Sequence, residues 1–238
     1  MILGIYGYQD SGKTTLVERL VRALVRRGYS VASVKHTPHR KSMDCDGKDT
    51  WRHWKAGSDP VVFSSASETV IIIHRAMSGE EIAELMMDRF KPDVLIVEGA
   101  KEGRFPKVAV GNVRIRRGTV LSNPSLKRLV GYVEREVAVE RVRAQLPGLD
   151  CRKCGLDCDS LARAIASGSR KVRDCRELPD VKAEVRIGGE TLPMGRFASS
   201  VVDSAVRGVL GSLKGFQPGE VIEIRLLPKN TEPRKRRC

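Results

Sequence analysis

A glycine-rich loop close to the start of the chain constrains its fold more than any other feature. Residues 7–14 read GYQDSGKT and match the pattern G-x-x-x-x-G-K-[ST]. The apolar residues 2–6 before it predict a buried strand, and residues 14–28 after it predict an amphipathic helix that ends at Gly28. A strand before and a helix after are the context in which this pattern forms a phosphate-binding loop. With a second strand at residues 30–35, this βαβ unit predicts an α/β fold with a mostly parallel sheet flanked by helices.

The side chains of this loop suit a nucleoside triphosphate and Mg²⁺. Glycines allow backbone N–H groups to converge on phosphate oxygens, and the start of the helix adds the positive end of its dipole. Lys13 would contact the β- and γ-phosphates, and the Thr14 hydroxyl would ligate Mg²⁺. The predicted nucleotide-binding residues of the loop are Gly7, Asp10, Ser11, Gly12, Lys13, Thr14 and Thr15.

A carboxylate beside the metal is expected at the end of another buried strand. Residues 94–99 read VLIVEG, so this strand delivers Glu98 at its carboxyl end. Asp93 stands before the same strand and would lie at its opposite end. We therefore predict that Glu98 completes the metal site with Thr14, directly or through water.

Four of the six cysteines form a second motif, with the spacing C-x₂-C-x₃-C-x₁₆-C. The chain has no apolar run of the ~18 residues that a membrane-spanning helix needs, and its N-terminus has no basic signal-peptide start. We therefore expect a cytoplasmic protein, in which clustered cysteines bind metal more often than they form disulfides. Four thiolates suit tetrahedral Zn²⁺ or a [4Fe–4S] cluster, and three close cysteines with one remote one favour the cluster. The predicted ligands are Cys151, Cys154, Cys158 and Cys175.

The chain is basic, with 43 Lys and Arg against 29 Asp and Glu and a net charge of +14. Residues 229–238 (KNTEPRKRRC) hold the one concentrated run, and the rest of the excess is spread thinly. Aromatic residues are 5% of the chain and do not alternate with basic ones, which argues against a nucleic-acid partner. A small anionic ligand such as a nucleotide suits the diffuse excess equally well.

Changes in composition divide the chain into four predicted segments. Residues 1–148 form a nucleotide-binding domain that ends at Pro147-Gly148, and residues 149–180 form a four-cysteine metal-binding module. Residues 181–228 form a small α+β module, and residues 229–238 form a solvated basic tail. Local patterns predict helices at 50–57, 79–90, 136–145 and 198–213, paired strands at 61–65 and 69–75, one or two strands within 107–115, an apolar stretch at 129–133, a hairpin around Gly188-Gly189 and a strand at 220–227.

Three further motifs follow the phosphate loop: SVKHTPH from residue 33, DCDGKDTWRHWKAG from residue 44 and LIVEGAKEGRFPK from residue 95. Together they resemble the molybdopterin-guanine dinucleotide biosynthesis adaptor family, MobB, over residues 1 to about 112. The resemblance implies a P-loop NTPase fold and a GTP-binding adaptor that assists attachment of GMP to the molybdenum or tungsten pterin cofactor. It also implies weak or no GTP hydrolysis, a guanylyltransferase partner and a homodimer. The chain departs from the family at Tyr8-Gln9-Asp10-Ser11, which replaces a loop of smaller residues.

Residue roles carried over by motif position are expectations from this resemblance. Lys13, Asp44 and Glu98 are the catalytic candidates, and Asp49 joins the two carboxylates on the metal and water side. Anionic ligands would meet Lys35, His36 and Arg52. The preference for GTP rests on the resemblance alone, because the chain has no N-K-x-D tetrapeptide for base recognition. The four-cysteine segment resembles short [4Fe–4S] domains of corrinoid and electron-transfer proteins, with x₃ where those show x₄.

Two other functions fit the same loop. One is a metallochaperone-type GTPase or ATPase in metal-centre maturation, for which the cysteines would handle metal. The other is a small-molecule kinase, with Arg114, Arg116 and Arg117 as its lid. The GKDT stretch at residues 47–50 favours the adaptor. A cluster in the cysteine module would be a redox element, a sensor or a structural staple, and the structural role is the simplest for so small a module.

Overall fold

A computed structural model describes residues 1–37, 39, 42–99, 101–178, 183–217, 219 and 221–224. The chain divides into two compact units, the first made of Met1–Ala144 with Ala162–Arg170, the second of Gln145–Leu161 with Lys171–Cys238. The predicted basic tail lies outside the described residues. Of the strand predicted at 220–227, residues 221–224 are described, and they form no strand. Among the described helices, none is long and apolar enough to cross a membrane.

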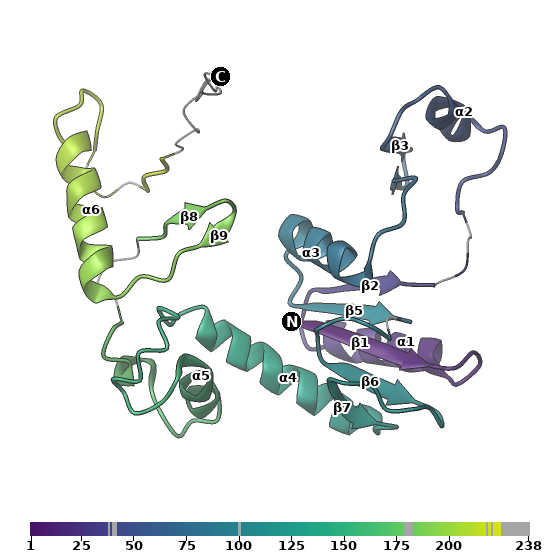
Figure 1. Cartoon of the computed structure of the whole chain (residues 1–238), viewed down its shortest axis with the longest axis horizontal. Helices are drawn as coiled ribbons and strands as arrows, with labels where there is room; N and C mark the ends of the chain where they lie inside the picture. Colours follow the sequence, from purple (N-terminus) through teal and green to yellow (C-terminus); the bar gives the residue numbers. More distant parts are fainter. Residues whose placement is uncertain are drawn as a thin grey trace, which may run out of the picture. The chain divides into compact units, whose positions relative to one another are not determined.

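A five-stranded sheet forms the centre of the first unit, with the strand order β2-β5-β1-β6-β7 (Figure 1). Every neighbouring pair in it is parallel, so the carboxyl ends of all five strands lie at one edge. This confirms the predicted α/β class with a mostly parallel sheet. The strands are β1 (Ile2–Gly7), β2 (Val31–Lys35), β5 (Val94–Glu98), β6 (Lys107–Val110) and β7 (Thr119–Ser122).

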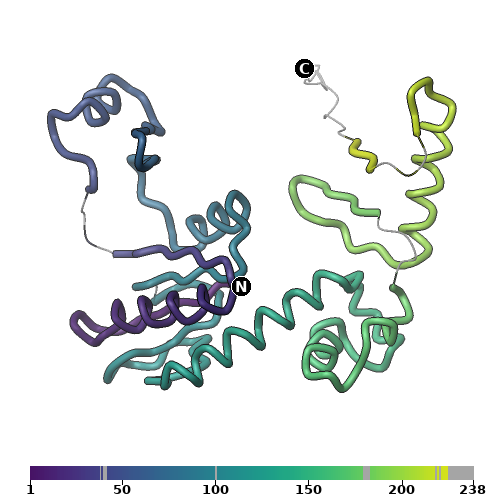
Figure 2. Tube along the Cα trace, turned by 180° about the vertical axis from the view of Figure 1, so that it is seen from behind, coloured from purple at the N-terminus to yellow at the C-terminus, as the bar shows by residue number. Residues whose placement is uncertain are grey.

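Helices cover both faces of this sheet, because successive strand residues point to opposite sides. Leu3 and Ile5 of β1 share a core with α1 and α4, whereas Leu95 and Val97 of β5 pack with Ala83 of α3 on the other face. Figure 2 shows α1 on the near side of the strands. The helices of this unit are α1 (Lys13–Val25), α2 (Asp49–Lys55), α3 (Gly79–Phe90) and α4 (Leu126–Arg143).

At the end of this unit the structure goes beyond the prediction in two places, although the helix predicted at 136–145 does form, as part of α4. Strand β7 was missed, because a four-residue edge strand carries little periodicity. The stretches 129–133 and 136–145 are one helix, α4, which begins after the cap residue Ser125. Its buried residues recur at helical spacing and pack on the sheet, and this tertiary contact outweighs the β-branched residues that suggest a break. They are Leu129, Val130, Val133 and Val137.

Strands β3 (Val61–Ser64) and β4 (Thr69–Ile72) pair antiparallel, as predicted, and follow α2. We call residues 42–75, which contain these three elements, the hairpin segment. Val62 lies opposite Ile71 in this pair and both are exposed, whereas Val61 on the other face is buried.

The second unit holds short elements around the cysteines and one longer helix. The predicted hairpin forms at Gly188-Gly189, where both glycines have positive φ as a tight turn requires. The predicted helix near residue 198 is also present. Its elements are η1 (Val172–Asp174), β8 (Arg186–Ile187), β9 (Glu190–Thr191) and α6 (Arg196–Leu210), and α5 (Cys158–Ala166) begins in it.

Candidate functional site

The phosphate loop joins the end of β1 to the start of α1 in a backbone path that needs glycine. A Cβ on Gly7 would collide with the carbonyl oxygen of Val110 and with the Ser11 hydroxyl. Gly12, the N-cap of α1, has φ +85°, and Asp10 has φ +57°, a conformation that aspartate tolerates. The loop is therefore wound tightly against the end of β6, with the first N–H groups of α1 at its centre.

Lys13 curls back over its own loop. Its Nζ donates to the carbonyl oxygen of Tyr8 and, at 3.4 Å, to the hydroxyl of Ser11. In loops of this pattern the lysine reaches the β- and γ-phosphates. In this structure the Lys13 ammonium lies instead against the Tyr8 end of the loop.

Glu98 lies beside the first turn of α1, at the carboxyl end of β5. It is 5% exposed, and its Oε1 accepts a hydrogen bond of 2.9 Å from the Thr14 hydroxyl. The same oxygen accepts from Lys35 Nζ at the end of β2. A hydroxyl and a carboxylate this close can ligate one Mg²⁺, which binds few protein oxygens and keeps several waters. The donor set fits the ion, and Lys35 supplies the positive charge in this structure.

Lys35 and His36 are held next to Glu98 by their backbone. The His36 N–H donates to the Glu98 carbonyl oxygen at 2.8 Å, which extends the pairing of β2 with β5. Gly99 has φ +91°, and a Cβ there would collide with the His36 carbonyl oxygen. The Lys-His and Glu-Gly pairs therefore interlock at the ends of adjacent strands.

Asp93 lies at the other end of β5, as its place in the sequence predicted. Its carboxylate accepts from Arg141 at 2.7 Å and from the Ser30 N–H at 2.9 Å. The Arg141 hydrogen bond, with those from Ser30, holds the pKa of Asp93 below its ordinary value. Asp93 therefore ties β5 to α4 and to the start of β2.

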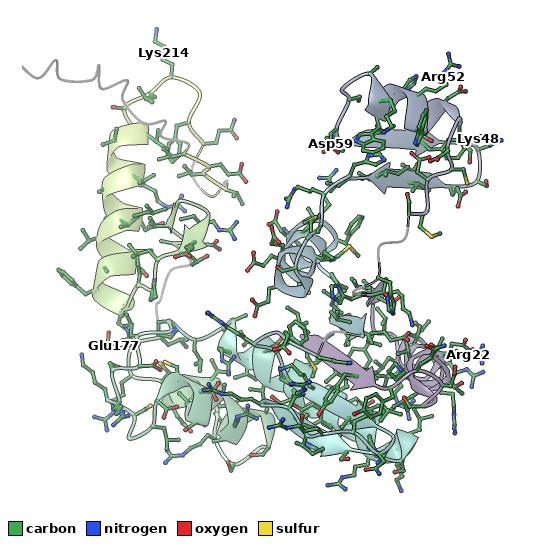
Figure 3. The ribbon with its side chains drawn as sticks, turned by 45° about the vertical axis from the view of Figure 1, so that its right-hand side comes forward. Arg22, Lys48, Arg52, Asp59, Glu177 and Lys214 are labelled. Atoms are coloured by element: carbon green, nitrogen blue, oxygen red, sulfur yellow. The ribbon has the colours of Figure 1, made fainter. Side chains whose placement is uncertain are left out.

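The hairpin segment holds Asp44, Asp49 and Arg52. Their described side-chain contacts are to residues of the same segment. Asp44 accepts from the Thr50 hydroxyl at 2.7 Å and lies 3.5 Å from His74 Nε2, with its side chain 4% exposed. Asp49 Oδ1 lies 3.7 Å from the Arg52 guanidinium (Figure 3). These described contacts join neither Asp44 nor Asp49 to the phosphate loop, so their expected place beside the nucleotide stays a prediction.

The sequence analysis did not single out His74, which contacts Asp44 and Trp54 within the hairpin segment. Its ring stacks on Trp54 with centroids 4.1 Å apart and planes 5° apart, and its backbone N–H donates to the carboxylate of Asp59. A histidine at the end of an apolar strand was the available signal. The stack closes the hairpin segment around Asp44.

Lys107, from the Pro-Lys pair of the third motif, has a structural part. It is 3% exposed, and its Nζ donates to the carbonyl oxygens of Gly103 at 2.6 Å and Arg117 at 2.9 Å. Those bonds fasten the loop after β5 to the loop before β7.

The cysteine loop in the second unit winds tightly. Asp150, Arg152 and Gly155 have φ of +45°, +56° and +86°, and left-handed non-glycine residues of this kind persist where surrounding structure imposes them. The Cys158 N–H donates to Asp150 at 2.8 Å, and Lys153 donates to Glu177 at 2.5 Å. These bonds hold the loop near the remote cysteine.

The Cys175 thiol lies within electrostatic range of the other three cysteines. Burial raises the pKa of Cys175, and the neighbouring Cys154 and Cys151 raise it further. Burial likewise raises the pKa of Cys158, to which Cys175 adds. Yet among the described residues no three His, Cys, Asp or Glu side chains are arranged to hold a metal ion. The chemistry of four nearby thiols fits a thiolate-ligated group, whereas their present arrangement is not a formed site.

Two family models match the chain. "Molybdopterin guanine dinucleotide synthesis protein B" (MobB) matches residues 2–134, and "Putative Fe-S cluster" matches residues 146–176. The first match covers the phosphate loop, Lys35, His36 and Glu98, and the second covers all four clustered cysteines.

Individual proteins named after the same biosynthetic step are also similar to this chain in sequence. A Methanocaldococcus jannaschii protein named "Putative molybdopterin-guanine dinucleotide biosynthesis adapter protein" is 28% identical over 235 residues, 94% of this chain and 97% of that protein. A Haemophilus influenzae "Molybdopterin-guanine dinucleotide biosynthesis adapter protein" is 38% identical over 109 residues, 45% of this chain and 61% of that protein. The structure titled "The Crystal structure of Bacillus subtilis MobB" is 23% identical, covers 56% of this chain and 95% of its own, and superposes with a TM-score of 0.44.

Proposed function

The chain belongs to the MobB family, and on that premise we propose that it is a GTP-binding adaptor that assists guanylylation of the molybdenum or tungsten pterin cofactor. The observation that carries the proposal is the contact of Thr14 with Glu98 beside the Lys13 loop. It is the arrangement that a magnesium nucleotide needs. Its partner would be the guanylyltransferase that performs the transfer, with the pterin cofactor as the shared substrate.

The residues of the first unit would bind the nucleotide in a defined order along the loop. The N–H groups at the start of α1 would hold the phosphates, and Lys13 would leave the Tyr8 carbonyl to contact the terminal ones. Mg²⁺, when bound, neutralises phosphate charge. Thr14 and Glu98 would hold it, and Lys35, 63% exposed, would swing away from the carboxylate. His36 is fixed by its backbone at the same edge and can meet an anionic ligand.

Weak or absent hydrolysis is consistent with how Glu98 is bound. A general base must accept a proton from the attacking water at a free lone pair. Glu98 Oε1 already accepts from the Thr14 hydroxyl and the Lys35 ammonium. In the nucleotide complex Mg²⁺ would take the place of Lys35 on this carboxylate, so Glu98 would serve the metal rather than an attacking water, which suits an adaptor that holds GTP rather than an enzyme that consumes it.

We also propose that Cys151, Cys154, Cys158 and Cys175 bind a [4Fe–4S] cluster, with Zn²⁺ as the alternative. The family match over residues 146–176 and the nearness of the other three thiols to Cys175 support a shared ligand. A cluster would supply four covalent cross-links to a segment with little core of its own. The role of the cluster would be structural, because its four cysteine ligands would fix the fold of this segment.

A homodimer through the hairpin segment is supported by its uncovered face. Val62 and Ile71 lie opposite each other on β3 and β4 and are 55% and 61% exposed. A second copy of the same face would bury both pairs, as a two-fold interface is self-complementary.

The proposal is tested by the variant Lys13→Ala, with Lys127→Ala, an exposed lysine on α4, as the matched control. Calorimetric titration with Mg-GTP should show binding for wild type and Lys127→Ala and none for Lys13→Ala. Purified guanylyltransferase and pterin cofactor should form more dinucleotide product with wild type than with Lys13→Ala. Equal product with and without the chain would refute the adaptor, and rapid acceptor-dependent ADP formation would make it a kinase.

A further inference from the structure

A small, shallow cleft lies beside the phosphate loop. Its lining includes Tyr6 and Tyr8 from the loop strand, Lys101 after β5, and Arg114 and Arg116 after β6. The floor is rigid, because Tyr6 is 2% exposed and its hydroxyl accepts from the Arg116 N–H at 2.9 Å and bonds the Thr119 hydroxyl at 2.8 Å. Side chains from three separate parts of the chain therefore converge on one built surface.

The cleft is cationic and carries one exposed aromatic face. Lys101 Nζ lies 5.9 Å from the centre of the Tyr8 ring, which is 62% exposed. Glu102 reaches Arg116 at 4.0 Å from a 91% exposed position at the rim. Among the ion pairs of the described residues, none includes Lys101 or Arg114, so these two positive charges line the cleft without an acidic partner. Such a surface suits an anion attached to a planar ring.

The position of the cleft relative to the proposed nucleotide site restricts further which ligand it could bind. The cleft begins at Tyr8, whose carbonyl oxygen accepts from Lys13, the residue that would contact the terminal phosphates. Guanylyl transfer breaks a bond at the α-phosphate and releases pyrophosphate. A ligand in the cleft would lie beyond the terminal phosphate and away from the α-phosphate. This chain would therefore hold the ligand and the nucleotide together without transferring the guanylyl group, as we expect of an adaptor.

We propose that this cleft is a second subsite that binds the phosphorylated pterin, with its phosphate at Arg114 and Lys101 and its ring on Tyr8, while the phosphate loop holds GTP. This inference rests on the proposed function, from which the identity of the second ligand follows. It assigns a separate task to the loop at residues 113–116, which the nucleotide site does not use.

The test is a fluorescence titration of the full chain, saturated with Mg-GTP, using 6-hydroxymethylpterin monophosphate as the probe. Wild type should bind the probe with GTP still bound, and the unphosphorylated pterin should bind more weakly. Arg114→Gln should weaken probe binding by about tenfold, as expected for one charge-assisted hydrogen bond, with GTP affinity unchanged. Arg117→Gln is the matched control, because Arg117 is exposed in the same loop and does not line the cleft.

The outcomes separate the two proposals. GTP binding without probe binding, or equal probe affinity in the Arg114 and Arg117 variants, would overturn the subsite and leave the adaptor standing. Displacement of the probe by GTP would mean that the nucleotide itself occupies the cleft, and it would also overturn the subsite. Probe binding that depends on Arg114 in a chain that fails to bind GTP would instead sink the adaptor.

Discussion

The hydroxyl of Thr14 donates a hydrogen bond of 2.9 Å to Oε1 of Glu98, a residue 84 positions further along the chain. The contact exists because β1 and β5 are adjacent and parallel, so the start of α1 and the end of β5 meet at one edge of the sheet. Lys35, from the next strand, supplies a positive charge to the same carboxylate. The candidate metal site is thus a product of strand order.

Replacing Glu98 by Gln should remove the effect of Mg²⁺ on GTP binding. The amide keeps the shape and can still accept from Thr14, yet it lacks the charge that attracts the cation. We expect wild type to bind GTP more tightly with Mg²⁺ than with EDTA, and Glu98→Gln to lose roughly tenfold or more of that gain. Calorimetry measures both. Asp93→Asn, at the other end of the same strand, is the control, and a similar loss there would contradict the assignment.

Loading of the cysteine module should improve as pH rises. Burial raises the pKa of Cys158 and Cys175, so these thiols are protonated at neutral pH and must release protons to bind metal. Reconstitution with iron and sulfide at pH 6.5, 7.5 and 8.5 should therefore give increasing occupancy, measured by bound iron and by absorbance near 400 nm.

Two substitutions give that experiment its controls. Cys175→Ser should lose most of the iron at every pH, whereas Cys45→Ser, at an exposed cysteine of the hairpin segment, should match wild type. An iron occupancy that does not change with pH would contradict the prediction that the thiols must lose protons before they bind the metal. Zinc without iron after aerobic and anaerobic purification would favour the alternative metal.

Introducing a charge on the uncovered face of the hairpin segment should dissociate the proposed dimer. Ile71→Lys places an ammonium opposite Val62, and burying it unpaired in a self-complementary interface would cost several kcal/mol. Light scattering after size exclusion should then show a monomer, with Glu68→Lys as the exposed control in the adjoining turn. A wild type that is monomeric at micromolar concentration would end this idea.

Asp93→Asn should reduce stability near neutral pH and flatten its dependence on acid. The folded-state pKa of Asp93 lies below its ordinary 3.8, chiefly because Arg141 donates to it. Its stabilising contribution is therefore complete above that ordinary value and is lost as pH falls through the folded-state pKa. We expect about 1 kcal/mol at pH 7, because the pair is partly exposed and screened. Thermal unfolding of both forms between pH 7 and 3 measures it, and parallel curves would refute it.

Local sequence pattern was enough to predict the glycine-rich loop and the strand that carries Glu98. The loop at residues 7–14 lies between strand and helix as predicted, because its glycines and the flanking periodicity act over a few residues. Glu98 and Asp93 could be assigned to opposite ends of one strand for the same reason. The MobB resemblance extended this to Lys35 and His36, which the structure places beside Glu98.

Tertiary structure decided what depends on residues far apart in the chain. Local pattern does not show that Asp44 contacts His74, that Lys107 is buried between two loops, or that Tyr8, Lys101 and Arg114 line one cleft. Strand β7 and the single helix α4 were likewise decided by packing on the sheet. The sequence by itself determined an α/β unit with a glycine-rich loop between its first strand and helix, and a thiol-rich segment, since these follow from spacing and periodicity. Which side chains face each other across the loop was decided by strand order and core burial.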